Sequence, residues 1–247
     1  MIAEPLQWIC ALLGAVMVGI SKAGIMGLSI LSVALFTHVF PSSKQASGLV
    51  LPLLIFGDFV AVLSYRAHTQ WRYLWKLMPW TAAGVVLGYL ALGHISDETA
   101  RILIGVIIVS LCMLGYWRRY ISAPRQETET WHWALAAAVG VTAGFITLVA
   151  NAAGPLMAIY LVAMRLPKMQ FVGTAAMFFM ALNLFKVPFM IDLGLITAQS
   201  FEFNLALAPA VLLGAFAGRW LLMRINQQLF EQLVLGLSAI AGVLLIV

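Results

Sequence analysis

The stretch Ser21-Lys-Ala-Gly-Ile-Met-Gly27 interrupts an apolar run that extends from residue 6 to residue 40. A second stretch, Asn151-Ala-Ala-Gly-Pro155, interrupts an apolar run from residue 131 to residue 164. Glycine gives the backbone conformational freedom at both breaks, and proline suits the first turn of a helix. We therefore expect a new helix to begin at the end of each stretch, near Gly27 and near Pro155, in the middle of a long apolar segment.

The composition indicates that most of the surface faces lipid. Of the 247 residues, 63% are hydrophobic and 9% are charged, which is too few charged residues for the water-facing surface of a soluble domain. A helix needs about 20 apolar residues to cross a hydrocarbon core of roughly 30 Å. Because lipid offers the backbone no hydrogen bonds and the apolar runs do not alternate with polar residues, we predict an all-α integral membrane protein. The apolar runs are 6–40, 46–65, 77–95, 102–117, 131–164, 170–191, 203–223 and 229–247.

The two halves of the chain repeat one another. Gly27 corresponds to Gly154 and Pro41 to Pro167, and a pair of glycines at 84 and 88 corresponds to a pair at 214 and 218. These offsets of 126 to 130 residues indicate a duplication, with one repeat over 1–117, a polar cytoplasmic linker over 118–130 and a second repeat over 131–247. Each repeat contains one interrupted segment and three ordinary transmembrane helices, which gives roughly six full spans plus the two interrupted segments.

Basic residues in short loops predict the orientation. The loop after the second run holds Arg66, Arg72 and Lys76, whereas its counterpart in the second half holds Asp192 and Glu202 and no basic residue. Equivalent loops are therefore expected on opposite sides of the membrane, so that the repeats have inverted topology. This requires an odd number of crossings in each half, so each interrupted segment is predicted to be a re-entrant hairpin.

The same rule assigns four basic segments to the cytoplasm, and both termini then face the periplasm. These segments are 66–76, 118–125, 165–168 and 219–224. Lys44 is the one basic residue that this arrangement places outside.

Several functional classes are excluded or left open by the sequence. The formal net charge of +5 comes from short basic clusters between apolar runs, so membrane topology explains it and no nucleic-acid partner is expected. Cys10 and Cys112 have no neighbouring His or Cys, so we expect no metal site and no cofactor. The sequence contains no cluster of a nucleophile with a base that would indicate an enzyme. A homo-oligomer stays open, because the paired glycines can pack helices within one chain or between chains.

Lys22 lies within the first interrupted segment, where burying an ammonium is costly. An anionic substrate would compensate its charge, and the helix N-termini expected beside both breaks would add N–H donors and positive dipole ends. The alternative is a lysine that reaches the membrane interface or pairs internally with a carboxylate. We favour the anion site.

Three further polar residues lie inside apolar runs of matching helices. Asp58 and Lys186 would form an internal ion pair, which acts either as a coupling or gating element or as a static structural pair. Asn183 lies one helical turn before Lys186 and can face the same cavity, although a hydrogen-bonded core amide is the preferred interpretation.

These motifs resemble the TauE/SafE family of bacterial membrane proteins, also called sulfite exporters. The resemblance rests on the breaks at 22–27 and 151–155, on Gln45-Ala-Ser-Gly48 after Pro41, and on Phe171-Val-Gly-Thr-Ala175, which is similar to the family's Ala-Val-Gly-Thr-Ser element. It implies export of small organosulfur anions, such as sulfite or a sulfonate like sulfoacetate, across the bacterial inner membrane.

Our functional hypothesis is an anion exporter that works by alternating access, with a proton as the coupling ion if transport is coupled. An anion channel of the same architecture and a non-transport membrane assembly factor are the alternatives. Asp58, Asn183 and Lys186 are the candidates for coupling or gating. The candidate substrate-binding residues are Ser21, Lys22, Gly24, Gly27, Leu28, Ser47, Gly48, Asn151, Gly154, Pro155, Gly173 and Thr174.

Overall fold

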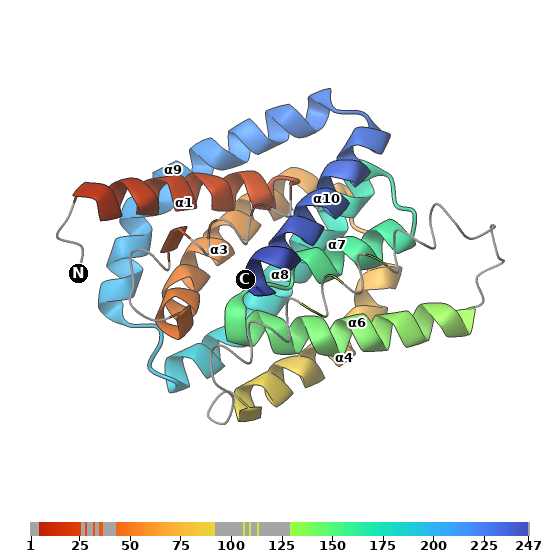
Figure 1. Ribbon diagram of the computed structural model, residues 1–247, viewed down its shortest axis with the longest axis horizontal. Helices are drawn as coiled ribbons and strands as arrows, with labels where there is room; N and C mark the ends of the chain where they lie inside the picture. Colours follow the sequence, from red (N-terminus) through yellow and green to blue (C-terminus); the bar gives the residue numbers. More distant parts are fainter. Residues whose placement is uncertain are drawn as a thin grey trace.

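The computed structural model describes residues 5–25, 28, 32, 35, 36, 43–91, 106, 109, 113 and 129–246, and these residues form helices and short connections (Figure 1). The predicted all-α class is confirmed for this part of the chain. The run at 102–117 and most of 26–40 lie outside it. The helices are α1 (Pro5–Lys22), α3 (Ser43–Tyr65), the short 3-10 helix η1 (Arg66–His68), α4 (Trp71–Ala91), α6 (Glu129–Ala150), α7 (Gly154–Ala163), α8 (Lys168–Asp192), α9 (Ala198–Arg224) and α10 (Gln227–Ile246).

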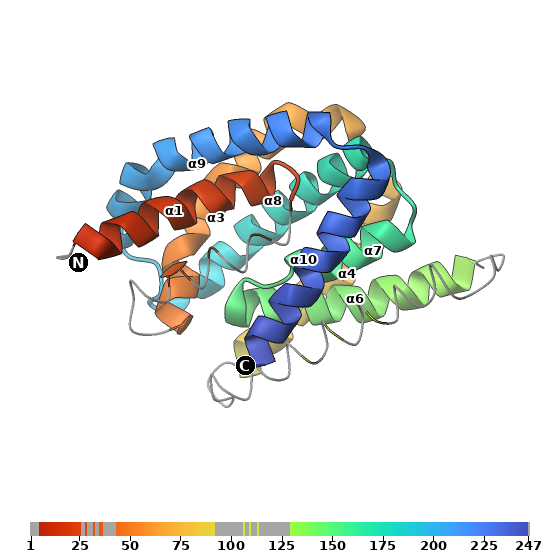
Figure 2. The ribbon, with the colours of Figure 1, turned by 45° about the horizontal axis from the view of Figure 1, so that its top comes forward.

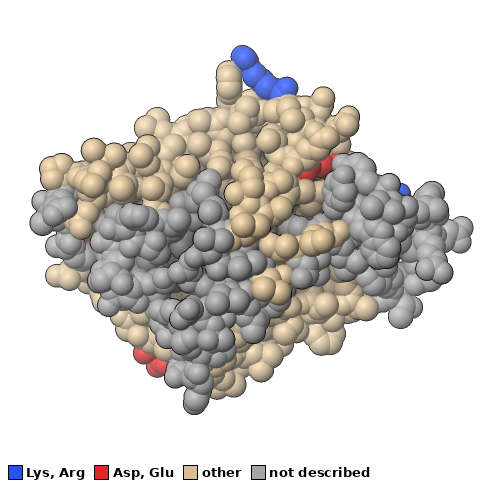
Figure 3. Space-filling model, in the orientation of Figure 1, with Lys and Arg blue, Asp and Glu red and all other residues tan. Residues whose placement is uncertain are grey.

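Four of the described helices are long and apolar enough to cross a membrane: Pro5–Lys22, Val50–His68, Lys168–Asp192 and Ala198–Arg224. Large apolar side chains such as Leu213 and Phe216 point outward, as expected where lipid is the solvent. The face in Figure 3 accordingly carries few charged side chains among the residues drawn in colour.

Two helices begin a full turn or more before their apolar runs. Helix α4 begins at Trp71, whereas the apolar run begins at residue 77. The first turns of the helix contain Arg72 and Lys76, so a search for apolar residues misses its start. Helix α9 begins at Ala198 instead of residue 203, where Thr197 and Ser200 form a capping box.

The predicted break in the second long segment is confirmed. Helix α6 ends at Ala150, and α7 begins at Gly154 with Pro155 in its first turn. Asn151 has the left-handed φ of 51°, which asparagine tolerates better than most residues. In the first segment α1 ends at Lys22, and Gly24 turns the chain with a φ of 150°. The expected helix start at Gly27 lies outside the described residues.

Two pairs of helices pack closely through glycines. Helix α1 lies beside α9, and α4 lies beside α6, in both views of the ribbon (Figures 1 and 2). A Cβ atom added to Gly214 would collide with the backbone oxygen of Val16, and one added to Gly84 would collide with that of Val141. The predicted glycine pairs therefore pack helices within this chain.

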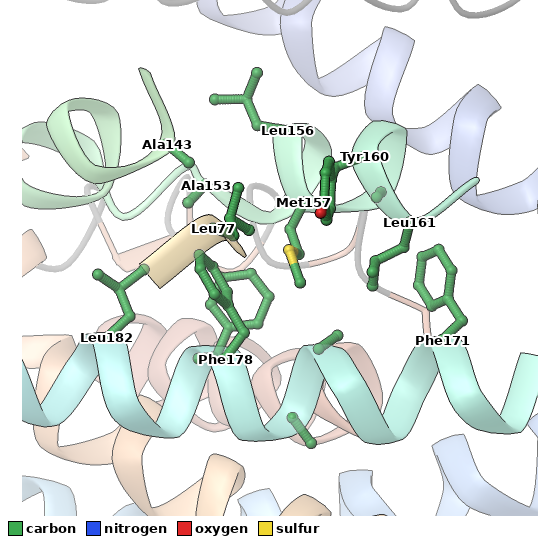
Figure 4. Close-up of a cluster of buried hydrophobic side chains, with 14 of the residues drawn as sticks. Leu77, Ala143, Ala153, Leu156, Met157, Tyr160, Leu161, Phe171, Phe178 and Leu182 are labelled. Atoms are coloured by element: carbon green, nitrogen blue, oxygen red, sulfur yellow. The ribbon is translucent and has the colours of Figure 1, made fainter. Parts of the chain in front are cut away.

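The short helix α7 forms the centre of the larger hydrophobic core. Every residue from Gly154 to Val162 is buried. Met157 on α7 and Phe178 on α8 point toward one another across the space between the two helices (Figure 4). Helix α10 crosses near α7 on another side. A helix that is apolar all round is stable only when it is enclosed in this way.

Three of the basic segments gather at one end of the bundle. The Lys168 ammonium donates to the carbonyls of Leu222 and Ile225, at distances of 3.0 and 2.6 Å. The Arg219 guanidinium lies 5.8 Å from the Tyr65 ring, next to Arg66. Asp192, which accepts a hydrogen bond of 2.6 Å from Tyr89, lies at the far end of α8 from Lys168.

Replacing Gly214 by alanine is expected to lower the free energy of unfolding by about 1 to 3 kcal/mol, because the new methyl group meets backbone that cannot move aside. Thermal unfolding in detergent measures the change. Gly236→Ala on α10 is the control, since no atom lies within 4 Å of a Cβ atom at that position. Equal melting temperatures for the two variants would show that the α1 and α9 contact is not tight.

Candidate functional site

A small cavity lies where α1 ends and α7 begins. Its volume is about 30 Å³, which is enough for a few water molecules. Helices α1, α3, α6, α7 and α8 all contribute to its wall, so the two breaks predicted from the sequence converge on one place. The lining residues are Ser21, Lys22, Leu54, Asp58, Thr147, Asn151, Gly154, Ala176, Phe179 and Asn183.

A buried ion pair forms one side of the cavity. The Lys22 Nζ atom lies 2.7 Å from Asp58 Oδ1, with 9% of the lysine side chain and none of the aspartate side chain exposed. The ammonium also lies 4.5 Å from the centre of the Phe179 ring, whose face attracts a cation. A carboxylate in a bundle that faces lipid is stable only with such partners.

Lys186 lies behind the cavity wall and is fully buried. Its ammonium donates to Thr147 Oγ1 at 3.2 Å and to Asn183 Oδ1 at 3.5 Å, and it makes a short hydrogen bond with Asn151 Oδ1. Each of these three partners lines the cavity. Lys186 therefore orients three side chains of the cavity wall without lining the cavity itself.

The pairing of Asp58 differs from the one expected from the sequence. Asp58 forms its ion pair with Lys22, and it reaches Lys186 through Asn183, whose Nδ2 atom donates to Asp58 Oδ2 at 2.6 Å. Lys22 thus has the internal carboxylate partner that was the alternative interpretation for this residue. The reason is geometric, since the end of α1 brings Lys22 beside Asp58 of α3 and Phe179 of α8.

The N-terminus of α7 also reaches the cavity. Gly154 is the first residue of α7 and lines the cavity, and no side chain caps this end of the helix. The first N–H groups of a helix lack partners within the helix and carry its positive dipole end. This end of the cavity is therefore suited to an anion.

Other candidate residues lie away from the cavity. Gly48 packs against Leu195, and Gly173 packs against the backbone of Tyr65 and His68. Thr174 accepts a hydrogen bond of 2.9 Å from the backbone N–H of Gln70. These contacts give the three residues a packing role, and their approach to a substrate stays a prediction.

The remaining candidates belong to the segments around the breaks. Pro155 is buried beside Gly154, and Gly24 and Leu28 follow the end of α1. None of the three lines the cavity. Gly27 lies outside the described residues, and the side chain of Ser47 is not among the described ones.

Four residues of the cavity wall were not expected from the sequence: Leu54, Ala176, Thr147 and Phe179. The last two contact the buried lysines. Thr147 lies one helical turn before Asn151 on α6, and Phe179 lies one turn before Asn183 on α8. Residues four positions apart share a helix face. The spacing of four from the candidates Asn151 and Asn183 is therefore the signal that would have found Thr147 and Phe179.

Replacing Asp58 by Asn or Lys22 by Met leaves one buried charge without its partner, which is expected to cost about 3 to 5 kcal/mol of unfolding free energy in each case. The double variant removes both charges and is expected to recover most of this loss. Chemical unfolding of the four proteins in detergent gives the coupling energy. Additive losses in the double variant would contradict a direct ion pair.

Comparisons with curated proteins and with solved structures gave no match to the chain. A family model does match: the one described as "Sulfite exporter TauE/SafE" covers residues 10–245, nearly the whole chain. The described helices fit a multi-pass membrane protein of such a family. The chain therefore belongs to the TauE/SafE family of sulfite exporters.

Proposed function

We propose that this protein exports a small organosulfur anion, sulfite or a sulfonate such as sulfoacetate, by alternating access. The observation that carries the proposal is the convergence of the two broken segments on one polar cavity inside an apolar bundle. The family supports the class of substrate.

The cavity wall has the chemistry that an anion with several oxygens needs. The ammonium of Lys22 and the uncapped N-terminus of α7 at Gly154 supply positive charge and N–H donors. Ser21 and Thr147 add hydroxyl groups, which donate hydrogen bonds to oxygen. Broken helices near the membrane centre serve anion binding in other transporters.

The size of the cavity favours alternating access over an open pore. A volume of about 30 Å³ holds only a few water molecules, so it leaves little room for a sulfonate with a carbon chain such as sulfoacetate. On this proposal the helices move before the substrate enters, and the described conformation is a closed one. A channel would need a continuous path instead, and an assembly factor would not need the polar cavity. These two remain the alternative functions.

Reciprocal contacts support the inverted repeat. Gly214 of the second half packs on Val16 of the first, and Gly84 of the first half packs on Val141 of the second. The loop contacts follow the same rule, since Gly48 meets the backbone of Leu195 as Gly173 meets that of Tyr65. Such exchange of equivalent contacts is what two repeats related by a pseudo-two-fold axis would make. We retain repeats over 1–117 and 131–247, joined by the cytoplasmic linker 118–130.

The basic residues at one end of the bundle support a single orientation. Lys168, Arg219 and Arg66 lie together, so one side of the membrane would carry them all. The positive-inside rule makes this side cytoplasmic in the bacterial inner membrane and places both termini in the periplasm.

The network from Lys22 through Asp58 and Asn183 to Lys186 is the candidate coupling element. Opening the cavity changes the distances between these charges, and a proton that binds Asp58 would release Lys22. A proton is therefore the proposed coupling ion.

Filling the cavity tests the proposed transport site. Ala176 lines the cavity, and Ala176→Leu is expected to abolish sulfoacetate and sulfite efflux from proteoliposomes without changing any charge. Ala206→Leu is the matched control, because Ala206 is exposed on the outer face of α9. Saturable wild-type efflux favours a transporter over a channel. Equal efflux by the Ala176→Leu and wild-type proteins would contradict this site.

Cysteine labelling tests the inverted topology. In a protein without Cys10 and Cys112, His68→Cys is expected to be labelled only from the cytoplasm and Gln199→Cys only from the periplasm by a reagent that does not cross the membrane. Both positions are exposed, with His68 in η1 after α3 and Gln199 in the first turn of α9 after α8, at the equivalent place in the second half. Labelling of both cysteines from the same side would contradict the inverted repeat.

A further inference from the structure

We infer that the contact between α4 and α6 ends in a binding site for the headgroup of an anionic phospholipid. The site consists of Trp71, Arg72, Trp75 and Lys76 of α4 and Trp133 of α6. It lies away from the polar cavity, so the inference does not depend on the transported substrate. It requires only that the chain lies in a bilayer, as its family and its apolar helices indicate.

The first two turns of α4 carry two aromatic and two basic side chains. Trp71 and Trp75 lie one helical turn apart, and so do Arg72 and Lys76. The apolar run of this helix begins at residue 77, so these turns lie where the hydrocarbon core meets the headgroups. Tryptophan is enriched at this level of a membrane protein, and basic residues there attract anionic lipids.

The two indole rings of α4 form one exposed apolar surface. Their centroids lie 6.4 Å apart, and the ring planes are inclined by 26°. Trp71 is 48% exposed and Trp75 is 68% exposed. The opposite side of the same turns buries Leu74 and Leu77 in the protein. A rigid aromatic surface at this level suits the glycerol and upper acyl groups of a lipid, which a free phosphate ion lacks.

A second helix contributes to the site through a cation–π contact. The Lys76 Nζ atom lies 5.3 Å from the centre of the Trp133 ring on α6, so the ammonium lies where the two helices meet. Arg72 is exposed one turn closer to the start of α4. A guanidinium binds a phosphate group through two N–H groups, and an ammonium adds a point charge. A headgroup that binds both cations therefore contacts α4 and α6 together.

The site lies at one end of the glycine contact between these helices. Further along the same pair, a Cβ atom added to Gly140 would lie 2.7 Å from Trp80 Cβ, and one added to Gly84 would collide with the backbone of Val141. These contacts join the middle of the two helices. A headgroup bound at Lys76 would join their ends, so we expect the lipid to raise the melting temperature of the protein.

The charge of this surface favours a lipid over a second copy of the chain. A two-fold interface brings the same patch of both subunits together, which would place Arg72 and Lys76 near their own copies. Like charges across an interface repel one another. An anionic phospholipid supplies the opposite charge, and its acyl chains lie in the hydrocarbon core below the headgroup.

Native mass spectrometry with defined lipids tests the site. Detergent-purified protein is titrated with phosphatidylglycerol and with phosphatidylethanolamine of the same acyl chains. The first phosphatidylglycerol is expected to bind at least about tenfold tighter than the first phosphatidylethanolamine. Replacing Arg72 and Lys76 together by Gln is expected to abolish this preference. Arg224→Gln is the matched control, because it removes an exposed arginine that lies 4.1 Å from the Trp220 ring on α9, and it is expected to keep the preference.

Trp75→Leu separates the aromatic surface from the charges. It leaves both cations and an apolar side chain in place, and the exposure of Trp75 makes the fold insensitive to the change. Phosphatidylglycerol affinity is expected to fall about threefold. Equal melting temperatures of the lipid-free variant and wild-type proteins would confirm that the fold is retained. Unchanged affinity would contradict a role for the indole rings.

Further results would overturn the inference. Equal wild-type affinity for the two lipids, or an equal loss of preference in Arg224→Gln, would indicate general attraction by basic residues and no site at α4. Inorganic phosphate that raises the melting temperature as much as phosphatidylglycerol does would identify a site for the free ion. A dimer that disappears when Arg72 and Lys76 are replaced would identify a second copy of the chain as the occupant.

Discussion

The buried ion pair between Lys22 and Asp58 is the interaction on which the rest of the arrangement depends. It holds the end of α1 against the middle of α3, with the two charged atoms 2.7 Å apart. Neither charge would be stable alone in a bundle whose outer surface faces lipid. The ion pair thus lies where the break after Lys22 and the break before Gly154 meet at one cavity.

The two breaks meet because the halves of the chain interlock. Helix α1 packs on α9 of the other half and α6 packs on α4, each through glycines that allow the backbones to touch. Lipid gives little hydrophobic drive for helix association, so this close contact supplies much of the stability. The helix pairs α1/α9 and α4/α6 can serve as a rigid frame, while the polar cavity is the part whose shape can change.

The amino-acid sequence predicted the elements better than their contacts. The break at Asn151 to Pro155 was predicted because glycine and proline interrupt an apolar run, and these residues act locally. The partner of Asp58 was predicted incorrectly. Asp58 pairs with Lys22, 36 positions before it, whereas Lys186, 128 positions after it, was expected. Thr147 and Phe179 were missed because a threonine or a phenylalanine in an apolar helix carries no signal of its own. Gly173 and Thr174 lie in a stretch that resembles a family motif, yet the structure places them against residues 65–70, where they have a packing role.

The most direct test of the account is the accessibility of a single cysteine at Ser21, which lines the cavity beside Lys22. The protein would lack Cys10 and Cys112 and be reconstituted in vesicles, and the probe would be a small, negatively charged methanethiosulfonate reagent applied from either side. The account predicts labelling from both sides of the membrane and protection by sulfoacetate, because the cavity opens alternately and holds the anion. Labelling that sulfoacetate does not reduce, or no labelling from either side, would contradict an anion site at the two broken helices.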